Sequence, residues 1–153
     1  MPRFMEDLKA GESFRSPMRV VTEREIIQFA GKYDNQPAHT DTELAGKTIF
    51  RGLAASGWHT AAMSFQLVLE SGLDLAGGIV GSNIENIVWA KPVRPGDSLY
   101  VTSEILSISP SSRNPVRGIV RMKNTTYNQA DELVMSMIGN VLTEMAPEIR
   151  TAE

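Results

Sequence analysis

The stretch from residue 52 to residue 71 constrains the fold most, because it is apolar on almost every side of a helix. Small residues stand early in it, and Ser56, His59 and Gln66 make it too polar and too short to span a bilayer. A helix without a polar face must be covered all round. We therefore expect a long central helix over about residues 52–71. Its apolar residues are Leu53, Ala54, Ala55, Trp58, Ala61, Ala62, Met63, Phe65, Leu67, Val68 and Leu69.

Strand-like segments follow this helix. Alternation is clearest in the third of them, where Val120 and Met122 face one way and Arg121 and Lys123 the other. This pattern predicts an antiparallel sheet with one solvated face. Turn residues separate four predicted strands, at residues 79–89, 98–108, 116–127 and 132–144. A fifth strand is expected near residues 12–21, where Pro17 confines it to an edge or a break.

The region before the central helix predicts shorter helices. Thr22 and Glu25 have the spacing of a capping box, so a helix should begin near Thr22 and end around Lys32, with a further helical turn over residues 41–47. A long apolar helix followed by antiparallel strands favours an α+β fold in which the sheet curls around the helix and buries it. The length of 153 residues favours one domain over residues 1–153.

Composition narrows the function. The chain has no cysteine and two histidines, which leaves no disulfide framework and little room for a metal site. The net charge of −3 argues against a nucleic-acid partner. The first residues carry charge where a signal peptide needs an apolar core. We expect a cytoplasmic protein that binds neither nucleic acid nor a membrane.

The segment YDNQPAHTD, residues 33–41, places Asp34 and His39 five positions apart. On a helix their side chains would diverge by about 140°, and in a strand they would face opposite sides. Because Pro37 argues against a helix and pushes Gln36 towards extended backbone, we expect a loop that brings both side chains to one water. The other histidine, His59, is expected in the core, bonded to a backbone carbonyl.

Three separated motifs resemble the MaoC-like dehydratases, the hydratase 2 type of enoyl-CoA hydratase, which have the hotdog fold. They are FAGKYDNQPAHTD at residues 29–41, FRGLAASGWHT at 50–60 and VWAKPVRPGDSL at 88–99. In this resemblance Asp34 and His39 are the catalytic pair. Gln36 stands where asparagine is usual, Tyr33 where a small residue is usual, and Arg51 where histidine often precedes Gly52. These departures imply a divergent subgroup.

The resemblance implies reversible hydration of an enoyl-CoA to a hydroxyacyl-CoA by a single hotdog domain. Gly52, expected at the start of the buried helix, would offer its N–H to the enolate oxygen, and Thr60 would place a hydroxyl near the water. No metal or organic cofactor is implied, since CoA is part of the substrate. Its phosphates would need cations such as Arg51, Lys91, Arg94 or Arg113. A homodimer or dimer-based oligomer is implied as well.

Two alternatives remain at this point. A hotdog acyl-CoA thioesterase would direct water at the carbonyl carbon, usually with a carboxylate on the central helix, but residues 53–69 contain no acid. The second alternative is a non-catalytic acyl-CoA-binding protein of the same fold. The retention of both Asp34 and His39 argues against this alternative.

Overall fold

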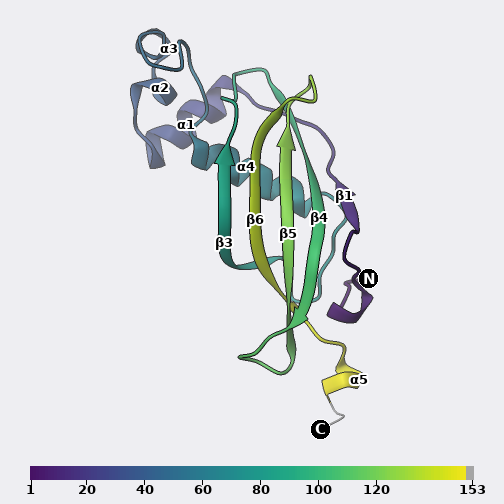
Figure 1. The fold of residues 1–153 in the computed structure, drawn as a ribbon. Coiled ribbons are helices and arrows are strands. Elements are labelled where there is room, and N and C mark those ends of the chain that lie inside the picture. The colour runs from purple at the N-terminus through teal and green to yellow at the C-terminus, as the bar shows by residue number, and fades with distance from the viewer. Residues whose placement is uncertain (151–153) are drawn as a thin grey trace.

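An antiparallel sheet of six strands and one helix that crosses it dominate the structure (Figure 1). The computed structural model describes residues 1–150. The helices are η1 (Met5–Asp7), α1 (Glu23–Tyr33), α2 (Pro37–Thr40), α3 (Thr42–Ala45), α4 (Gly57–Leu69) and α5 (Pro147–Arg150). The strands are β1 (Ser13–Arg15), β2 (Arg19–Val20), β3 (Val80–Trp89), β4 (Ser98–Pro110), β5 (Arg117–Tyr127) and β6 (Leu133–Glu144).

The strand order is β1-β4-β5-β6-β3, with β2 paired to β4 beside β1. All the pairings are antiparallel, and β3, the first long strand in sequence, forms the edge opposite β1. The four predicted long strands are confirmed. The expected fifth strand is broken into β1 and β2 around Pro17, since proline cannot donate to a ladder.

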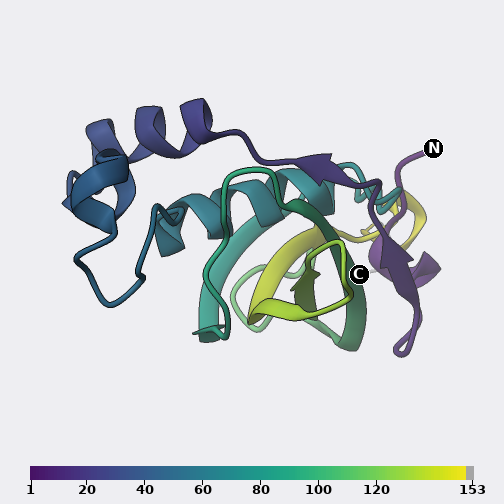
Figure 2. The same ribbon diagram turned by 90° about the horizontal axis from the view of Figure 1, so that it is seen from above.

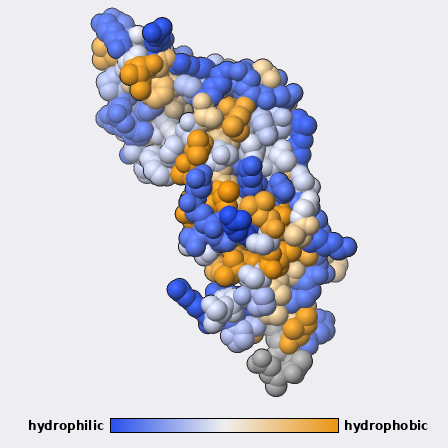
Figure 3. Space-filling view, viewed as in Figure 1, coloured by the Kyte–Doolittle hydropathy of each residue, from blue (hydrophilic) through white to orange (hydrophobic). Residues whose placement is uncertain are grey.

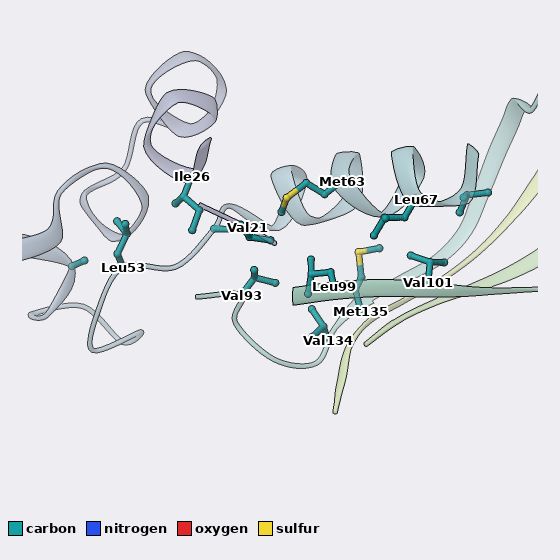
Figure 4. Packing of buried hydrophobic residues seen from close by; sticks show 13 residues of the cluster. Val21, Ile26, Leu53, Met63, Leu67, Val93, Leu99, Val101, Val134 and Met135 are labelled. Atoms are coloured by element: carbon teal, nitrogen blue, oxygen red, sulfur yellow. The ribbon is translucent and has the colours of Figure 1, made fainter. Parts of the chain in front are cut away.

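The sheet curves around one side of α4, which is the hotdog arrangement that the sequence predicts (Figure 2). Met63 and Leu67 point from α4 towards Leu99, Val101 and Met135 on the sheet (Figure 4). On the other face of the sheet, charged and half-buried apolar residues are mixed (Figure 3). This pattern agrees with the predicted alternation, because Val120 and Met122 are buried.

Two expectations for the central helix are wrong. It begins at Gly57, five residues later than Gly52, because residues 53–56 are not helical and the Ser56 side chain caps the first turn of α4. It is also covered on one side only. Its buried residues are His59, Thr60, Met63, Ser64, Leu67 and Val68, whereas Trp58, Ala62, Phe65, Gln66 and Leu69 are exposed. Among residues 1–150, no helix has both the length and the apolar character needed to cross a membrane.

Helices α1, α2 and α3 cluster at one end of the sheet (Figure 1). The capping box at Thr22 and Glu25 is confirmed: the Thr22 hydroxyl accepts from the Glu25 N–H, and the Glu25 carboxylate accepts from the Thr22 N–H. Helix α1 ends at Tyr33, one residue beyond the predicted end, and the predicted turn after residue 41 is α3. These helices carry the residues of the candidate site.

Candidate active site

A cavity of about 400 Å³ lies between α2, the start of α4 and the end of β3. Its lining is mainly apolar, and two of its polar residues are Asp34 and His39. The structure therefore brings together the two residues that the sequence singled out. The lining residues are Asp34, His39, Phe50, Ala55, Gly57, Trp58, Thr60, Trp89, Ala90, Lys91, Pro92 and Val93.

Asp34 is the C-cap residue that follows α1, and its side chain is largely buried. Its carboxylate accepts a hydrogen bond from the Gln36 side-chain amide at 2.5 Å. The Ser56 hydrogen bond, followed by that of Gln36, holds the pKa of Asp34 below its ordinary value, and partial burial only partly opposes them. Asp34 is therefore an anion at neutral pH.

His39 lies in α2, so the expectation that Pro37 excludes a helix here is wrong. Pro37 is the first residue of α2, a position where its missing N–H would have no partner in any case. Gln36, just before it, is extended as predicted. The short helix turns the His39 ring back towards Asp34, across the Gln36 turn.

The His39 ring has a defined tautomer. Its Nδ1 is 2.7 Å from the carbonyl oxygen of Ala54. A carbonyl oxygen only accepts, so Nδ1 carries the proton, and the Nε2 of the neutral ring has a free lone pair. Nε2 lies 3.6 Å from Oδ2 of Asp34. This distance is too long for a direct hydrogen bond, and it allows one water to contact both atoms.

Gly52 does not occupy the place expected for it. Its N–H donates to the carbonyl oxygen of Ala45 at 3.1 Å, and its φ of +156° suits glycine in the loop before α4. The glycine at the start of the helix is Gly57, which lines the cavity. The N–H of Gly57 has no acceptor among residues 1–150, as is usual in the first turn of a helix.

Thr60 lies in the first turn of α4, on the cavity wall. Its side chain is buried, and its hydroxyl donates to the carbonyl oxygen of Ser56 at 3.3 Å. The oxygen of that hydroxyl can still accept a hydrogen bond from the cavity side.

The four side chains proposed to bind the CoA phosphates have different surroundings. Lys91 lines the cavity and pairs with Glu132. Arg51 is exposed, next to Phe50 on the cavity wall. Arg94 is committed elsewhere, because its guanidinium donates to the carbonyl oxygens of Phe50, Gly52 and Leu53. Arg113 belongs to a different cavity, between the β4–β5 hairpin and the start of β3.

Sequence reasoning missed two features of this site. Trp58 and Trp89 meet edge to face, with ring centroids 5.3 Å apart, and form an aromatic wall of the cavity. Ser56 caps α4, and its hydroxyl is the largest cause of the lowered pKa of Asp34. Serine followed by glycine at the start of an apolar helix is a capping signal that locates Ser56. The meeting of Trp58 and Trp89 depends on strand register, which leaves no local signal.

His59 is buried, as expected, but its environment differs from the expectation. It stacks on Phe29 of α1 with ring centroids 4.6 Å apart, and its Nδ1 has no hydrogen-bond partner among the described residues. Burial holds the pKa of His59 below its ordinary value. His59 does not line the cavity of Asp34 and His39. Within residues 1–150, no three His, Cys, Asp or Glu side chains gather closely enough to hold a metal ion.

Comparison with known proteins identifies the family of this chain. A MaoC-like dehydratase from Rhodospirillum rubrum with a known crystal structure is 43% identical in sequence to this chain. The two structures superpose with a TM-score of 0.89, and the match covers 95% of this chain and 99% of that one. The Bacillus subtilis protein YdeM, described as uncharacterized, is 35% identical over 83% of this chain and 89% of its own length. An (R)-specific enoyl-CoA hydratase of Rhodospirillum rubrum is 30% identical over 72% of this chain and 74% of its own length. Residues 7–128 match the family model described as the MaoC like domain. The chain therefore belongs to the MaoC-like dehydratase family.

Proposed function

We propose that the protein catalyses the reversible addition of water to an enoyl-CoA, giving a hydroxyacyl-CoA. One observation supports this most strongly: the Nε2 atom of His39 faces the carboxylate of Asp34 across 3.6 Å inside a mainly apolar cavity. A basic lone pair beside a fixed anion is suited to taking a proton from water that attacks carbon.

In this proposal His39 is the base. Water bound between the two side chains gives a proton to Nε2 as its oxygen bonds to the β-carbon of the enoyl group. The carboxylate of Asp34 stabilises the imidazolium that forms, as an opposite charge at this distance does. The same proton then passes from Nε2 to the α-carbon, so one water is added across the double bond. Dehydration follows the reverse path.

The negative charge that develops on the thioester oxygen needs a donor. We assign this role to the N–H of Gly57, because it is free, lines the cavity and lies at the positive end of the α4 dipole. Gly52, whose N–H is already bonded to Ala45, shapes the loop instead. The Thr60 oxygen is placed to accept from the attacking water or the product hydroxyl.

The rest of the substrate follows from the same cavity. The acyl group would contact Trp58 and Trp89, and the CoA phosphates would contact Lys91, which lines the cavity, and Arg51, which follows Phe50 of the cavity wall. The thioester itself acidifies the α-carbon, so the proposed reaction requires no metal or organic cofactor. An acyl-CoA substrate fits a cytoplasmic location, where such thioesters are made and used.

We further propose a homodimer formed through β3 and the bare side of α4. Trp58 is 60% exposed on α4, and Ile84 and Val88 are 56% and 48% exposed on the edge strand. A long apolar edge strand is prone to pair with another chain. A second copy would extend the sheet and cover the apolar side of α4, which satisfies the requirement that an apolar helix be buried.

Turnover of short and medium enoyl-CoAs tests the function, with loss of the enoyl absorbance and release of free thiol followed in parallel. We expect bleaching without thiol release. Asp34→Asn and His39→Ala should each lower kcat by about 10²-fold or more, because each removes part of the acid–base pair. Asp74→Asn, a change of an exposed carboxylate outside the cavity, should leave kcat unchanged.

The outcomes separate the alternatives. Thiol release without bleaching would identify a thioesterase. Tight binding of acyl-CoA without turnover of any enoyl-CoA would identify a binding protein. Folded Asp34→Asn and His39→Ala proteins that hydrate at the wild-type rate would exclude the dyad while leaving the reaction in place.

A further inference from the structure

A second cavity, of about 450 Å³, lies on the face of the sheet that is turned away from α4. Its floor includes Ile119 of β5 and Leu142 of β6, which are half-buried and are opposite each other in register. The next pair in register, Val120 and Val141, is buried in the core. Because neighbouring residues of a strand point to opposite faces, Ile119 and Leu142 point away from the core. The lining residues are Ser82, Asn83, Ser111, Ser112, Arg113, Asn114, Arg117, Ile119 and Leu142.

This cavity is separate from the candidate active site. One of its walls is the β4–β5 hairpin, residues 111–116, and another is the start of β3. The hairpin lies at the opposite end of the sheet from α1, α2 and α3 (Figure 1). The two cavities have no lining residue in common. The second cavity therefore needs an explanation other than the proposed reaction.

Hydrogen bonds order the hairpin that carries Arg113. The N–H of Ser111 donates to the carbonyl oxygen of Arg117 at 2.8 Å, and the N–H of Arg117 donates to that of Asn114 at 3.2 Å. Within the turn, the Oγ of Ser111 accepts from the N–H of Arg113 at 3.3 Å. The Oδ1 of Asn114 accepts from the N–H of Val116 at 3.1 Å. The turn thus presents Arg113 and Arg117 to one cavity.

The same contacts leave the cavity rich in hydrogen-bond donors. A backbone N–H can only donate, so it occupies Oδ1 of Asn114 and leaves the side-chain NH₂ of that residue available. The N–H of Arg113 takes a lone pair of the Ser111 hydroxyl and leaves its proton available. Guanidinium groups only donate. A ligand that complements this cavity must therefore be rich in acceptors.

The charge of the cavity points the same way. No carboxylate lines it, and among residues 1–150 neither Arg113 nor Arg117 forms an ion pair. Glu85 of β3 pairs with Arg121 at 2.6 Å, and Glu144, which is opposite Arg117 in register, lines a different cavity. Two guanidinium groups beside neutral donors favour an anion, and their planar N–H forks match the oxygens of a phosphate.

The size and the floor of the cavity indicate more than a free phosphate ion. Cavities of about 300–1,000 Å³ hold small organic molecules. Ile119 and Leu142 offer apolar surface on which a ring or an alkyl group can lie. We propose that this cavity binds a phosphorylated small molecule, with its phosphate oxygens on Arg113 and Arg117 and its less polar part on Ile119 and Leu142.

Two sources share this chemistry. One is a free phosphorylated metabolite such as a nucleotide. The other is the nucleotide end of a CoA that is bound to a second copy of the chain, since the start of β3 forms both a wall of the cavity and part of an exposed sheet edge. The proposal concerns the phosphate site itself, which does not depend on the proposed reaction.

Isothermal titration calorimetry of the whole chain with ADP, pyrophosphate and adenosine tests the site. Wild type should bind ADP and pyrophosphate, and adenosine should bind about 10²-fold more weakly because it has no phosphate. Arg113→Gln and Arg117→Gln should each weaken ADP binding by about tenfold or more, since each removes charge-assisted hydrogen bonds. Arg24→Gln removes the same charge from an exposed position on α1 and should leave ADP binding unchanged.

Ser112→Glu is a second test that keeps both arginines. It adds a carboxylate to an exposed position of the lining and should weaken ADP binding as strongly as the loss of one arginine. If an arginine variant does not fold, Ser112→Glu decides in its place. Lys91→Gln, which changes the other cavity, should leave ADP binding at the wild-type level.

Two results would overturn the proposal. The first is a wild-type protein that binds neither ADP nor pyrophosphate in the millimolar range. The second is ADP binding that survives Arg113→Gln, Arg117→Gln and Ser112→Glu but is lost in Lys91→Gln, which would place the nucleotide in the candidate active site.

Titration with CoA then distinguishes the two sources. A double Arg113→Gln, Arg117→Gln variant that loses affinity for ADP and keeps its affinity for CoA supports the site and identifies a free metabolite as the ligand. Equal losses for ADP and CoA support the site as well, and identify the nucleotide end of CoA as the ligand. Neither result requires turnover of an enoyl-CoA, so the outcome is independent of the proposed function.

Discussion

The indole N–H of Trp89 donates a hydrogen bond of 2.8 Å to the carbonyl oxygen of Gly57. The ring of Trp89 lies so close to the Gly57 backbone that a Cβ added there would be 2.9 Å from two ring atoms. Position 57 therefore requires a glycine for close approach and not for its backbone angles. The contact holds the end of β3 against the first residue of α4, next to the proposed oxyanion donor.

Gly57→Ala should damage the site without unfolding the protein. The new methyl group must push the Trp89 ring or the first turn of α4 aside, and either movement displaces the Gly57 N–H. Loss of one oxyanion donor typically costs about 10²–10³ in rate, so we expect a fall in kcat of that order with little change in KM. Steady-state kinetics with an enoyl-CoA gives the measurement.

Gly31→Ala is the matched control. Gly31 lies in α1, and a Cβ there meets no atom within 4 Å. Alanine in a helix interior is favoured over glycine by about 0.5–1 kcal/mol, so Gly31→Ala should keep full activity and slightly raise the melting temperature. A Gly57→Ala protein that is as active as Gly31→Ala would remove Gly57 from the mechanism.

The contacts of Arg94 predict a second effect. Its guanidinium donates to backbone carbonyl oxygens of Gly52 and Leu53, at 2.9 and 3.1 Å, and to Phe50. The two-pronged guanidinium group thus holds the loop of residues 50–53, which leads into the site. Arg94→Lys keeps the charge and loses the fork, so we expect the free energy of unfolding to fall by about 2 kcal/mol, measured by urea denaturation.

Arg24→Lys, at an exposed position on α1, is the control for Arg94→Lys and should leave stability unchanged. If Arg94 bound a CoA phosphate instead, Arg94→Lys would raise KM and leave the free energy of unfolding as it was. The pair of measurements thus separates a structural arginine from a substrate-binding one.

The sequence predicts most of this fold because its signals are local. Alternation along residues 116–127, the capping box at Thr22 and the break at Pro17 each depend on neighbouring residues, and each matches the structure. The start of α4 is harder to predict. Leu53, Ala54 and Ala55 are as apolar as the helix itself, but they are not helical, and tertiary hydrogen bonds such as that from the Ala55 N–H to Val93 hold them in place.

The candidate site, too, is predictable where its signals are local and unpredictable where it depends on tertiary contacts. Asp34 and His39 are recognisable from their spacing and their motif, but the helix that joins them is not, because Pro37 is read equally well as a helix breaker or as a first helical residue. The contact between the Trp89 indole and the Gly57 carbonyl joins residues 32 positions apart in the sequence, so only the folded chain reveals it.

The exposed edge strand predicts the assembly state. Ile84→Lys places a charge in the middle of β3, where the proposed partner strand would pair, and should convert a dimer into a monomer. Light scattering after size-exclusion chromatography measures the mass. Ile49→Lys is the control, since Ile49 is 92% exposed and lies away from β3. A wild-type protein that is monomeric at micromolar concentration would contradict the proposed dimer.

The lowered pKa of His59 determines how this residue makes the free energy of unfolding depend on pH. Burial lowers its pKa in the folded state, so the folded protein resists a proton that the unfolded chain accepts at an ordinary histidine pKa of about 6.5. Above that pH both states are neutral at His59 and the full stability is present. As the pH falls below it, the unfolded chain is protonated first, and the free energy of unfolding decreases until the folded pKa is reached.

The variant His59→Phe should remove this dependence. Phenylalanine keeps the stack on Phe29 and eliminates a buried Nδ1 that has no partner among the described residues, so stability at pH 7.5 should be equal to or above that of wild type. Between about pH 6.5 and pH 5, the wild-type protein should lose more stability in urea denaturation than His59→Phe does. Because all other titrating groups are shared, the difference between the two curves isolates His59. Parallel curves over that range would mean that His59 takes up its proton as readily in the folded protein as in the unfolded chain.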